Sequence, residues 1–241
     1  MPASHPHPHG WGLPGGEVKK RKGERRKRKE EVRKRIPYRY LIVCEGTKTE
    51  PNYFDGIKKC IEKTYKNRVE VILKPEIEIE GTGKNTINLV DYALKKKRFT
   101  PIPYGHVWVV FDKDSFTDEQ FNNAILKAED NDINAAWSNE AIELWFLLHF
   151  EYMDAPLHRS QYQRKLEEHF RKLNINKGRY QKNLPNIFEI LTTYGNVERA
   201  ISYSEKLYRQ HENSGINSPA RMNPCTTVHN LVKELLEYIQ D

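Results

Sequence analysis

The sequence has few cysteines and no long apolar run, and each shortage excludes a class of protein. Cys44, Cys60 and Cys225 show no paired spacing, which is typical of a reducing compartment rather than of an exported disulfide scaffold. The longest apolar run, residues 141–150, contains Glu143 and falls well short of the ~18 residues that a membrane span needs. Because no apolar stretch follows the charges near the N-terminus, we expect no secretory signal. These absences predict a cytoplasmic protein without a membrane partner.

Several catalytic signatures are also missing. The chain has no His-Glu-x-x-His, no Cys-x-x-Cys and no glycine-flanked nucleophilic serine. Residues 81–84 (GTGK) look like a phosphate loop, but Asn85 stands where such a loop needs Ser or Thr, and Glu78 stands where it needs its first glycine. We therefore interpret this segment as a turn into a helix, with Lys84 kept as a candidate phosphate contact.

Positive charge is distributed unevenly along the 241 residues. The chain carries a net charge of +7, yet residues 19–35 alone carry +9. Residues 37–157 carry −5 and residues 158–241 carry +4. With a Pro-, Gly- and His-rich start, this pattern predicts a disordered tail over residues 1–36, an acidic α/β domain over 37–157 and a mildly basic region over 158–241. The two basic parts are suited to holding a polyanion.

Strand-like and helix-like segments alternate in the first part of the chain. This order predicts an α/β domain with a mostly parallel, four-stranded sheet flanked by helices. The expected strands are residues 38–44, 69–73, 107–111 and 133–137. Beyond residue 157 the apolar period is helical throughout, which predicts a helical C-terminal annex packed on the sheet, with helices over 160–173, 185–194, 197–209 and 226–239.

Acidic residues follow two of the expected strands. Glu45 comes after the first, and Asp112 and Asp114 come after the third. Ligands of parallel sheets bind at the carboxyl ends of the strands, where strand order changes direction. If the two strands are neighbours, three carboxylates converge, and their repulsion is costly unless a metal neutralises it. Oxygen ligands of this kind suit Mg²⁺ or Mn²⁺. The alternative is that these acids are ordinary exposed residues at strand ends.

Three further acids are candidates for the same site. Glu50 lies one turn into the first helix, where it either adds a ligand or only favours the helix dipole. Glu140 and Glu143 share one helix face by their spacing of three residues. Glu143 stands among apolar residues, where an unpaired carboxylate is expensive, so it needs a metal or a basic partner.

Four ordered blocks carry a resemblance to a known family. They are IVCEGTKTEPNYF, VWVVFDKDSF, AAWSNEAIELWFLLHF and NPCTTVHNLVKEL. Together they resemble the RloB-like family, bacterial and archaeal proteins often encoded with restriction or abortive-infection loci. The first two blocks are similar to the Toprim domain of topoisomerases, primases and several nucleases. This resemblance implies a Toprim-like, Rossmann-like fold in which Glu45, Asp112 and Asp114 bind metal, with a second metal at further carboxylates.

The resemblance also implies an activity and partners. It implies a Mg²⁺- or Mn²⁺-dependent Toprim nuclease that cleaves DNA or RNA, including tRNA, in anti-phage or abortive-infection defence beside a separately encoded ATPase. A non-catalytic nucleic-acid-binding or regulatory subunit is the first alternative, and a nucleotidyl transferase is the second. Homo-oligomerisation stays open. The candidate contacts to nucleic acid are Lys84, Arg164, Lys165, Arg171, Lys172, Arg179 and Lys182.

Overall fold

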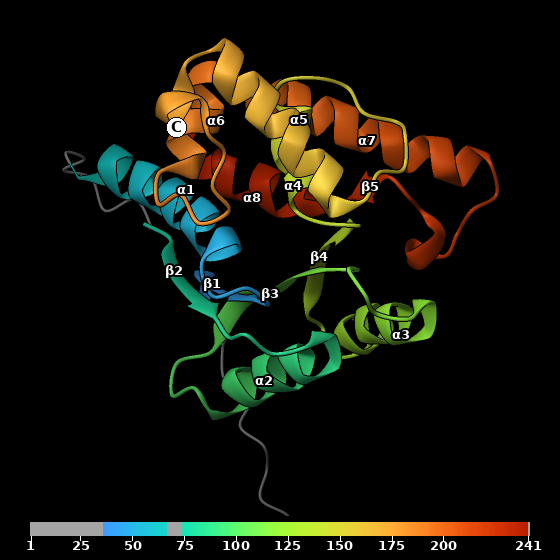
Figure 1. Cartoon of the computed structure of the whole chain (residues 1–241). Coiled ribbons are helices and arrows are strands. Elements are labelled where there is room, and N and C mark those ends of the chain that lie inside the picture. Colours follow the sequence, from blue (N-terminus) through green and yellow to red (C-terminus); the bar gives the residue numbers. More distant parts are fainter. Residues whose placement is uncertain (1–35, 67–73, 241) are drawn as a thin grey trace, which may run out of the picture. The chain divides into compact units, whose positions relative to one another are not determined.

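The computed structural model describes residues 36–66 and 74–240 (Figure 1). The chain divides into two units, residues 1–33 and 34–241, and every described residue belongs to the second. The predicted tail up to residue 35, its basic run and the expected strand over 69–73 lie outside the described residues. Within the described part, no helix is both long enough and apolar enough to cross a membrane.

A mostly parallel sheet forms the centre of this unit. Its strand order is β2-β1-β3-β4-β5. The strands are β1 (Ile36–Cys44), β2 (Glu76–Gly81), β3 (Tyr104–Asp112), β4 (Asn134–Asn139) and β5 (Cys225–Thr226). The first four run parallel, whereas β5 is antiparallel to β4. The chain passes from β1 to β2 on one side and then to β3 on the other, so strand order switches between β1 and β3.

The sheet therefore has five strands rather than the four predicted. The additional strand, β5, has two residues and comes from the C-terminal part of the chain, where Thr226 pairs with Ser138 and Cys225 with Asn139. A pair of residues is too short to show any strand periodicity in sequence. In addition, the strand beside β1 is formed by the acidic segment Glu76–Gly81, which the sequence pattern did not mark as a strand.

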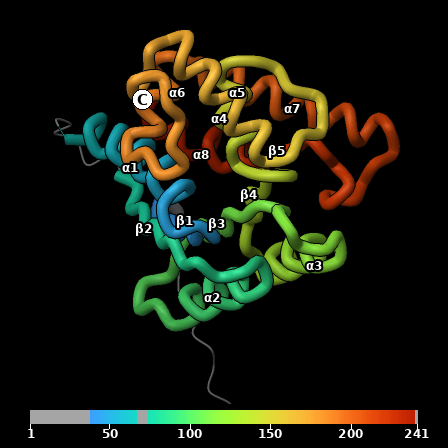
Figure 2. The backbone as a smooth tube through the Cα atoms, viewed as in Figure 1, coloured from blue at the N-terminus to red at the C-terminus, as the bar shows by residue number. Residues whose placement is uncertain are grey.

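Helices cover both faces of the sheet (Figures 1 and 2). The helices are α1 (Thr49–Tyr65), α2 (Thr86–Phe99), α3 (Asp118–Glu129), α4 (Glu143–Leu148), α5 (Arg159–Lys172), α6 (Ile187–Tyr194), α7 (Val197–Asn213) and α8 (Val228–Gln240), with short 3₁₀ turns at Ile175–Gly178 and Pro219–Arg221. Helices α2 and α3 lie on one face, and α1 and α8 lie on the other with the remaining helices stacked around them.

Two apolar cores follow from the alternation of side chains along the strands. Leu41 and Val43 of β1 pack toward α2 and α3, whereas Tyr40, Ile42 and Cys44 pack toward α1 and the C-terminal helices. Successive residues of a strand point to opposite faces, so each buried strand serves both cores. The C-terminal helices thus complete the larger core, and their loops come close to the carboxyl ends of the strands.

Local signals fix two of the helix starts. The Asn85 side chain accepts a hydrogen bond from the backbone N–H of Asn88, so the loop before it leads into α2 as expected for a capped turn. Thr117 and Gln120 form a capping box at the start of α3. Helix α4 begins at Glu143, so Glu140 precedes the helix and the two acids do not share a helix face as predicted.

Candidate functional site

The ends of β1 and β3 bring two of the predicted acids together. The strands are parallel neighbours, and the backbone N–H of Glu45 donates to the carbonyl oxygen of Val110 at 2.9 Å. The backbone N–H of Asp112 in turn donates to Oε2 of Glu45 at 3.3 Å. Because this is the point where strand order switches, the two carboxylates lie at the edge of the sheet where ligands of parallel sheets bind.

Two more carboxylates, from helices, join this pair. Burial raises the pKa of Asp112 well above its usual range, and the negative charges of Glu50, Glu143 and Glu45 raise it further. A backbone hydrogen bond at Ile142 acts in the opposite direction. We define Asp112 and the three carboxylates that raise its pKa as the acid cluster: Glu45, Glu50, Asp112 and Glu143.

Glu50 is a buried member of the acid cluster rather than a solvated residue of the first helical turn. It is only 6% exposed, and its carboxylate lies against the Cα of Gly46, where any Cβ would clash with Oε2. Burial raises the pKa of Glu50, as does the charge of Glu143, while the positive charge of Lys182 lowers it. Among the described residues, Oε2 of Glu50 has no hydrogen-bond partner.

Glu143 is fully buried at the start of α4, and neutral donors hold one of its oxygens. Oε1 accepts hydrogen bonds from Nε2 of Gln163 at 2.9 Å and from the Tyr180 hydroxyl at 3.4 Å. Burial and the neighbouring charge of Glu143 raise the pKa of Tyr180 well above its usual range, so the phenol stays a donor. Oε2 of Glu143 has no partner within the described part of the chain. One oxygen is thus fixed and the other is available to a ligand.

The structure directs Asp114 and Glu140 toward the start of α5 instead. Asp114 has a left-handed backbone (φ 41°) and forms an ion pair with Arg159, the first residue of α5. Nε2 of His158 lies 3.8 Å from Oε1 of Glu140. Arg159 thus pairs with one of the three strand-end acids, Asp114, and its charge also lowers the pKa of another, Glu45.

The carboxylate oxygens of the acid cluster are ligands of the kind that a hard divalent cation prefers. Within residues 36–66 and 74–240, no three acidic, histidine or cysteine side chains are arranged to hold one ion together. Mg²⁺, however, is usually held by one or two carboxylates, with water and substrate phosphates completing its shell. Glu45 and Asp112 supply such a pair, and the unpartnered oxygens of Glu50 and Glu143 supply further acceptors. A shell of three carboxylates requires side-chain rotation.

The basic residues predicted to contact nucleic acid differ in their exposure and in whether an acidic side chain already pairs with them. Lys182 is exposed. Its charge lowers the pKa of both Glu45 and Glu50, which indicates that it lies near the acid cluster. Lys165 and Arg171 form ion pairs with Glu151 (3.0 Å) and Glu167 (3.2 Å). The remaining candidates, Lys84, Arg164, Lys172 and Arg179, are exposed.

Sequence reasoning missed several residues that touch the acids. Gln163 and Tyr180, which bind Glu143, were not among the candidates, and neither was His158. Arg159 belongs to the basic residues that follow residue 157, which were expected to hold a polyanion, but its pairing with Asp114 was not predicted.

Fold and site together define a mixed α/β protein, with a five-stranded, mostly parallel sheet and an acid cluster at its switch point. A family model described as RloB-like protein matches residues 40–235, a stretch that contains all four sequence blocks. The chain therefore belongs to the RloB-like family. No curated protein and no solved structure matches it.

Proposed function

We propose that the chain is a Toprim-type nuclease that uses Mg²⁺ or Mn²⁺ to hydrolyse phosphodiester bonds in DNA or RNA. The observation that carries the proposal is the convergence of Glu45, Asp112, Glu50 and Glu143 at the switch point of a parallel sheet. Carboxylates with strongly shifted pKa values in a crevice are typical of functional sites. Membership of the RloB-like family and the likeness of the first two sequence blocks to Toprim domains support the same reading.

The mechanism assigns each acid a task. Glu45 and Asp112 would hold the cation, which would neutralise phosphate charge and make the attacking water more acidic. Glu50, with its raised pKa and an unpartnered oxygen, accepts the proton of the attacking water. The water oxygen forms a bond to phosphorus, the P–O3′ bond breaks, and the leaving oxygen takes a proton from solvent. Gln163 and Tyr180 keep Glu143 oriented toward the same space.

Basic residues near the acids hold the substrate. Lys182 and Arg159 both lower the pKa of Glu45, so they lie close to the acid cluster. In the proposed complex they contact phosphate oxygens of the substrate. The net charge of +9 over residues 19–35 adds affinity that does not depend on sequence. If deletion of residues 1–35 leaves nucleic-acid affinity and its salt dependence unchanged, the tail has no such role.

The resemblance to the RloB-like family supports a proposal on the cellular setting. We propose that the protein acts in the cytoplasm in anti-phage or abortive-infection defence, together with a separately encoded ATPase. The ATPase would gate cleavage, so activity assays need both the chain alone and the chain with the ATPase.

The experiment that tests the activity compares Asp112→Asn with the wild type. Purified protein is incubated with labelled DNA, tRNA and total RNA, with Mg²⁺ or Mn²⁺ or with EDTA, and with or without the ATPase. We expect metal-dependent cleavage that Asp112→Asn lowers at least 100-fold, as expected when a group that stabilises developing charge is removed. Asp130→Asn, an exposed acid at the end of α3, is the matched control.

Two outcomes would contradict the proposal. Equal cleavage by Asp112→Asn would remove the assigned site. Metal-independent binding of nucleic acid, with no cleavage of any substrate even beside the ATPase, would favour the alternative of a non-catalytic binding or regulatory subunit.

A further inference from the structure

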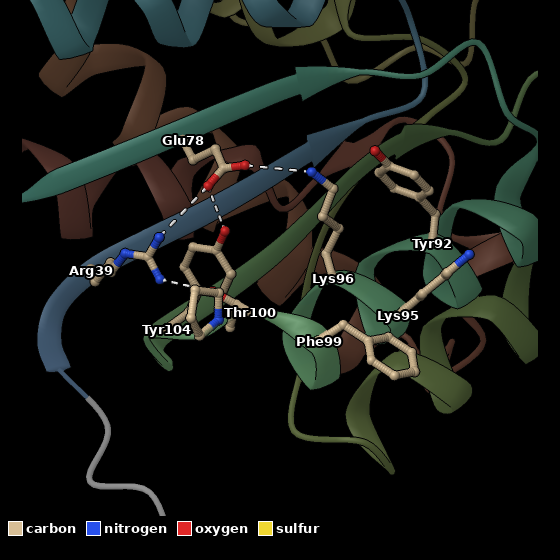
Figure 3. Close-up of a pocket in the computed structure, with 9 residues that line it drawn as sticks. Arg39, Glu78, Tyr92, Lys95, Lys96, Phe99, Thr100 and Tyr104 are labelled. Carbon is tan, nitrogen blue, oxygen red and sulfur yellow. Dashed lines mark hydrogen bonds and ion pairs between the residues drawn. The ribbon is translucent and has the colours of Figure 1, made fainter.

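A cavity of about 510 Å³ lies on the α2 face of the sheet, among residues of β1, β2, α2 and the start of β3 (Figure 3). Its volume is in the range of pockets that hold small ligands. It is separate from the acid cluster, because its β1 residue, Arg39, precedes Glu45 by six positions, or about 20 Å of extended strand. The proposed hydrolysis assigns this cavity no role.

An exposed aromatic ring stands at the cavity. Phe99, the last residue of α2, is 78% exposed, and Tyr92 and Tyr104 line the same cavity. Figure 3 shows the Phe99 ring projecting from the end of α2. A phenylalanine that is left this open offers a flat apolar surface on which another planar ring can stack.

A carboxylate with spare acceptor capacity lies across the cavity. Oε2 of Glu78 accepts a hydrogen bond from the Tyr104 hydroxyl at 2.5 Å. Two cations lie near Glu78 beyond hydrogen-bonding distance, Nζ of Lys96 at 3.6 Å from Oε1 and Nη2 of Arg39 at 3.9 Å from Oε2. A carboxylate has about four acceptor positions, and this side chain is 38% exposed, so Glu78 can still accept two N–H donors.

One cation of the cavity has no counter-charge. Arg39 is shared between Glu76 (3.3 Å) and Glu78, and Lys96 is shared between Glu78 and Glu80 (2.5 Å). Lys95, which also lines the cavity, pairs with none of the described carboxylates. The cavity therefore suits a ligand with a single negative charge, such as a phosphodiester, better than a triphosphate.

We propose that this cavity binds a guanine nucleotide. The base stacks on Phe99, its N1–H and N2–H₂ groups donate in parallel to the carboxylate of Glu78, and its phosphate lies at Lys95. Guanine is the base that fits, because it has two adjacent donors on one edge. Adenine and cytosine have one amino group beside an acceptor, and uracil has one N–H between two carbonyls. The shared chemistry is that of a free nucleotide or of one unpaired guanine in a strand.

The test is a binding titration of the full-length chain in EDTA, which prevents metal-dependent cleavage. The probes are labelled uridine hexanucleotides that carry one guanosine, inosine or adenosine, and guanosine monophosphate. Inosine lacks only the N2 amino group. We therefore expect the inosine hexanucleotide to bind at least about tenfold more weakly than the guanosine hexanucleotide, which is the discrimination that a bidentate contact gives. Comparable affinity for guanosine monophosphate and the guanosine hexamer identifies a free nucleotide as sufficient, and preference for the hexamer identifies a strand. Equal affinity for guanosine and inosine overturns the proposal.

Variants of the cavity residues test whether guanosine binds in this cavity. Phe99→Ala removes an exposed ring without opening the core and should weaken guanosine binding about tenfold, as loss of base stacking does. Glu78→Gln should abolish the preference over inosine. Leu126→Ala, an equally simple truncation of a 55% exposed side chain on α3, should change neither the affinity for guanosine nor the preference for guanosine over inosine. The titration is made in EDTA and scores the preference for guanosine over inosine, so its failure is distinguishable from failure of the proposed metal-dependent hydrolysis. Unchanged binding by Phe99→Ala would exclude this cavity.

Discussion

The backbone N–H of Asp112 donates a hydrogen bond to Oε2 of Glu45 at 3.3 Å, across 67 residues of sequence. The contact ties the ends of β1 and β3 to each other through one of the acids. Burial raises the pKa of Glu45 from 4.5 to about 7, and this hydrogen bond and the charges of Lys182 and Arg159 limit the rise. Glu45 therefore changes its charge near neutral pH, and this has consequences for stability and for metal binding.

The metal-free protein should lose stability as the pH rises from about 6.5 to 8. Because the pKa of Glu45 is higher in the folded state (about 7) than its ordinary 4.5, its contribution to stability is complete below 4.5 and is lost as the pH rises through 7. The raised pKa of Asp112 acts in the same direction. We expect the melting temperature in EDTA to fall by several degrees over this range and to recover with saturating Mn²⁺.

Two buried histidines act in the opposite direction, and a variant removes their effect from the measurement. Burial lowers the pKa of His149 and of His229 from 6.5 to about 4, so their contribution to stability is lost as the pH falls through this range, and it still grows slightly up to a pH of about 7.5. The difference in melting temperature between wild type and Glu45→Gln cancels the histidines and reports Glu45. Wild type should lose stability relative to Glu45→Gln as the pH rises from 6.5 to 8, and a constant difference would contradict the charge state assigned to Glu45.

The contact between Gln163 and Glu143 should be measurable as coupling. Gln163→Leu removes the 2.9 Å hydrogen bond to a fully buried carboxylate, so we expect the free energy of unfolding to fall by about 1–3 kcal/mol. Glu143→Leu removes the charge and its repulsion, and the double variant should be less destabilised than the sum of the two. Urea unfolding measures all three. Gln181→Leu, at an exposed glutamine, is the control, and a Gln163→Leu effect no larger than this control would mean that the contact contributes little.

The central part of the fold follows from local patterns in sequence. Strands β1, β3 and β4 are short apolar runs, and they lie within a few residues of their predicted positions. Strand β2 does not follow this rule, because its glutamates face Arg39 and Lys96 and its apolar content is two isoleucines. Strand β5 depends on pairing with β4 across the chain, which no local signal records.

The acid cluster, too, has members that local sequence patterns predict and contacts that only the fold brings together. Glu45 and Asp112 could be predicted because both follow buried strands, and parallel neighbours bring their carboxyl ends together. Gln163 and Tyr180 could not, because neutral hydrogen-bond donors that lie 20 and 37 residues from Glu143 leave no spacing pattern. The pairing of Asp114 with Arg159 depends on where α5 begins relative to β3, and a sequence does not show that placement.

The ion pair between Arg159 and Asp114 should oppose metal binding. Arg159→Gln removes a positive charge from beside the acid cluster and frees Asp114, so we expect a several-fold gain in Mn²⁺ affinity, measured by electron paramagnetic resonance of the free ion. Asp114→Asn in the same background should remove that gain if Asp114 is a ligand. Asn is chosen because it tolerates the left-handed backbone at this position. No change in Arg159→Gln would mean that this ion pair does not limit metal binding.

Lys182 should contribute more to nucleic-acid binding than Lys165, although both follow from the same count of basic residues. Lys182 is exposed beside Glu45 and Glu50, where a bound phosphate must come, whereas Lys165 is held by Glu151 at 3.0 Å. We expect Lys182→Gln to reduce the slope of log affinity against log salt concentration by about one, and Lys165→Gln to change it little. Titrations of a labelled oligonucleotide in EDTA at four salt concentrations measure both. Equal slopes for Lys182→Gln and wild type would move the substrate path away from the loop after Tyr180, and with it the role proposed for that loop in holding phosphate over the acids.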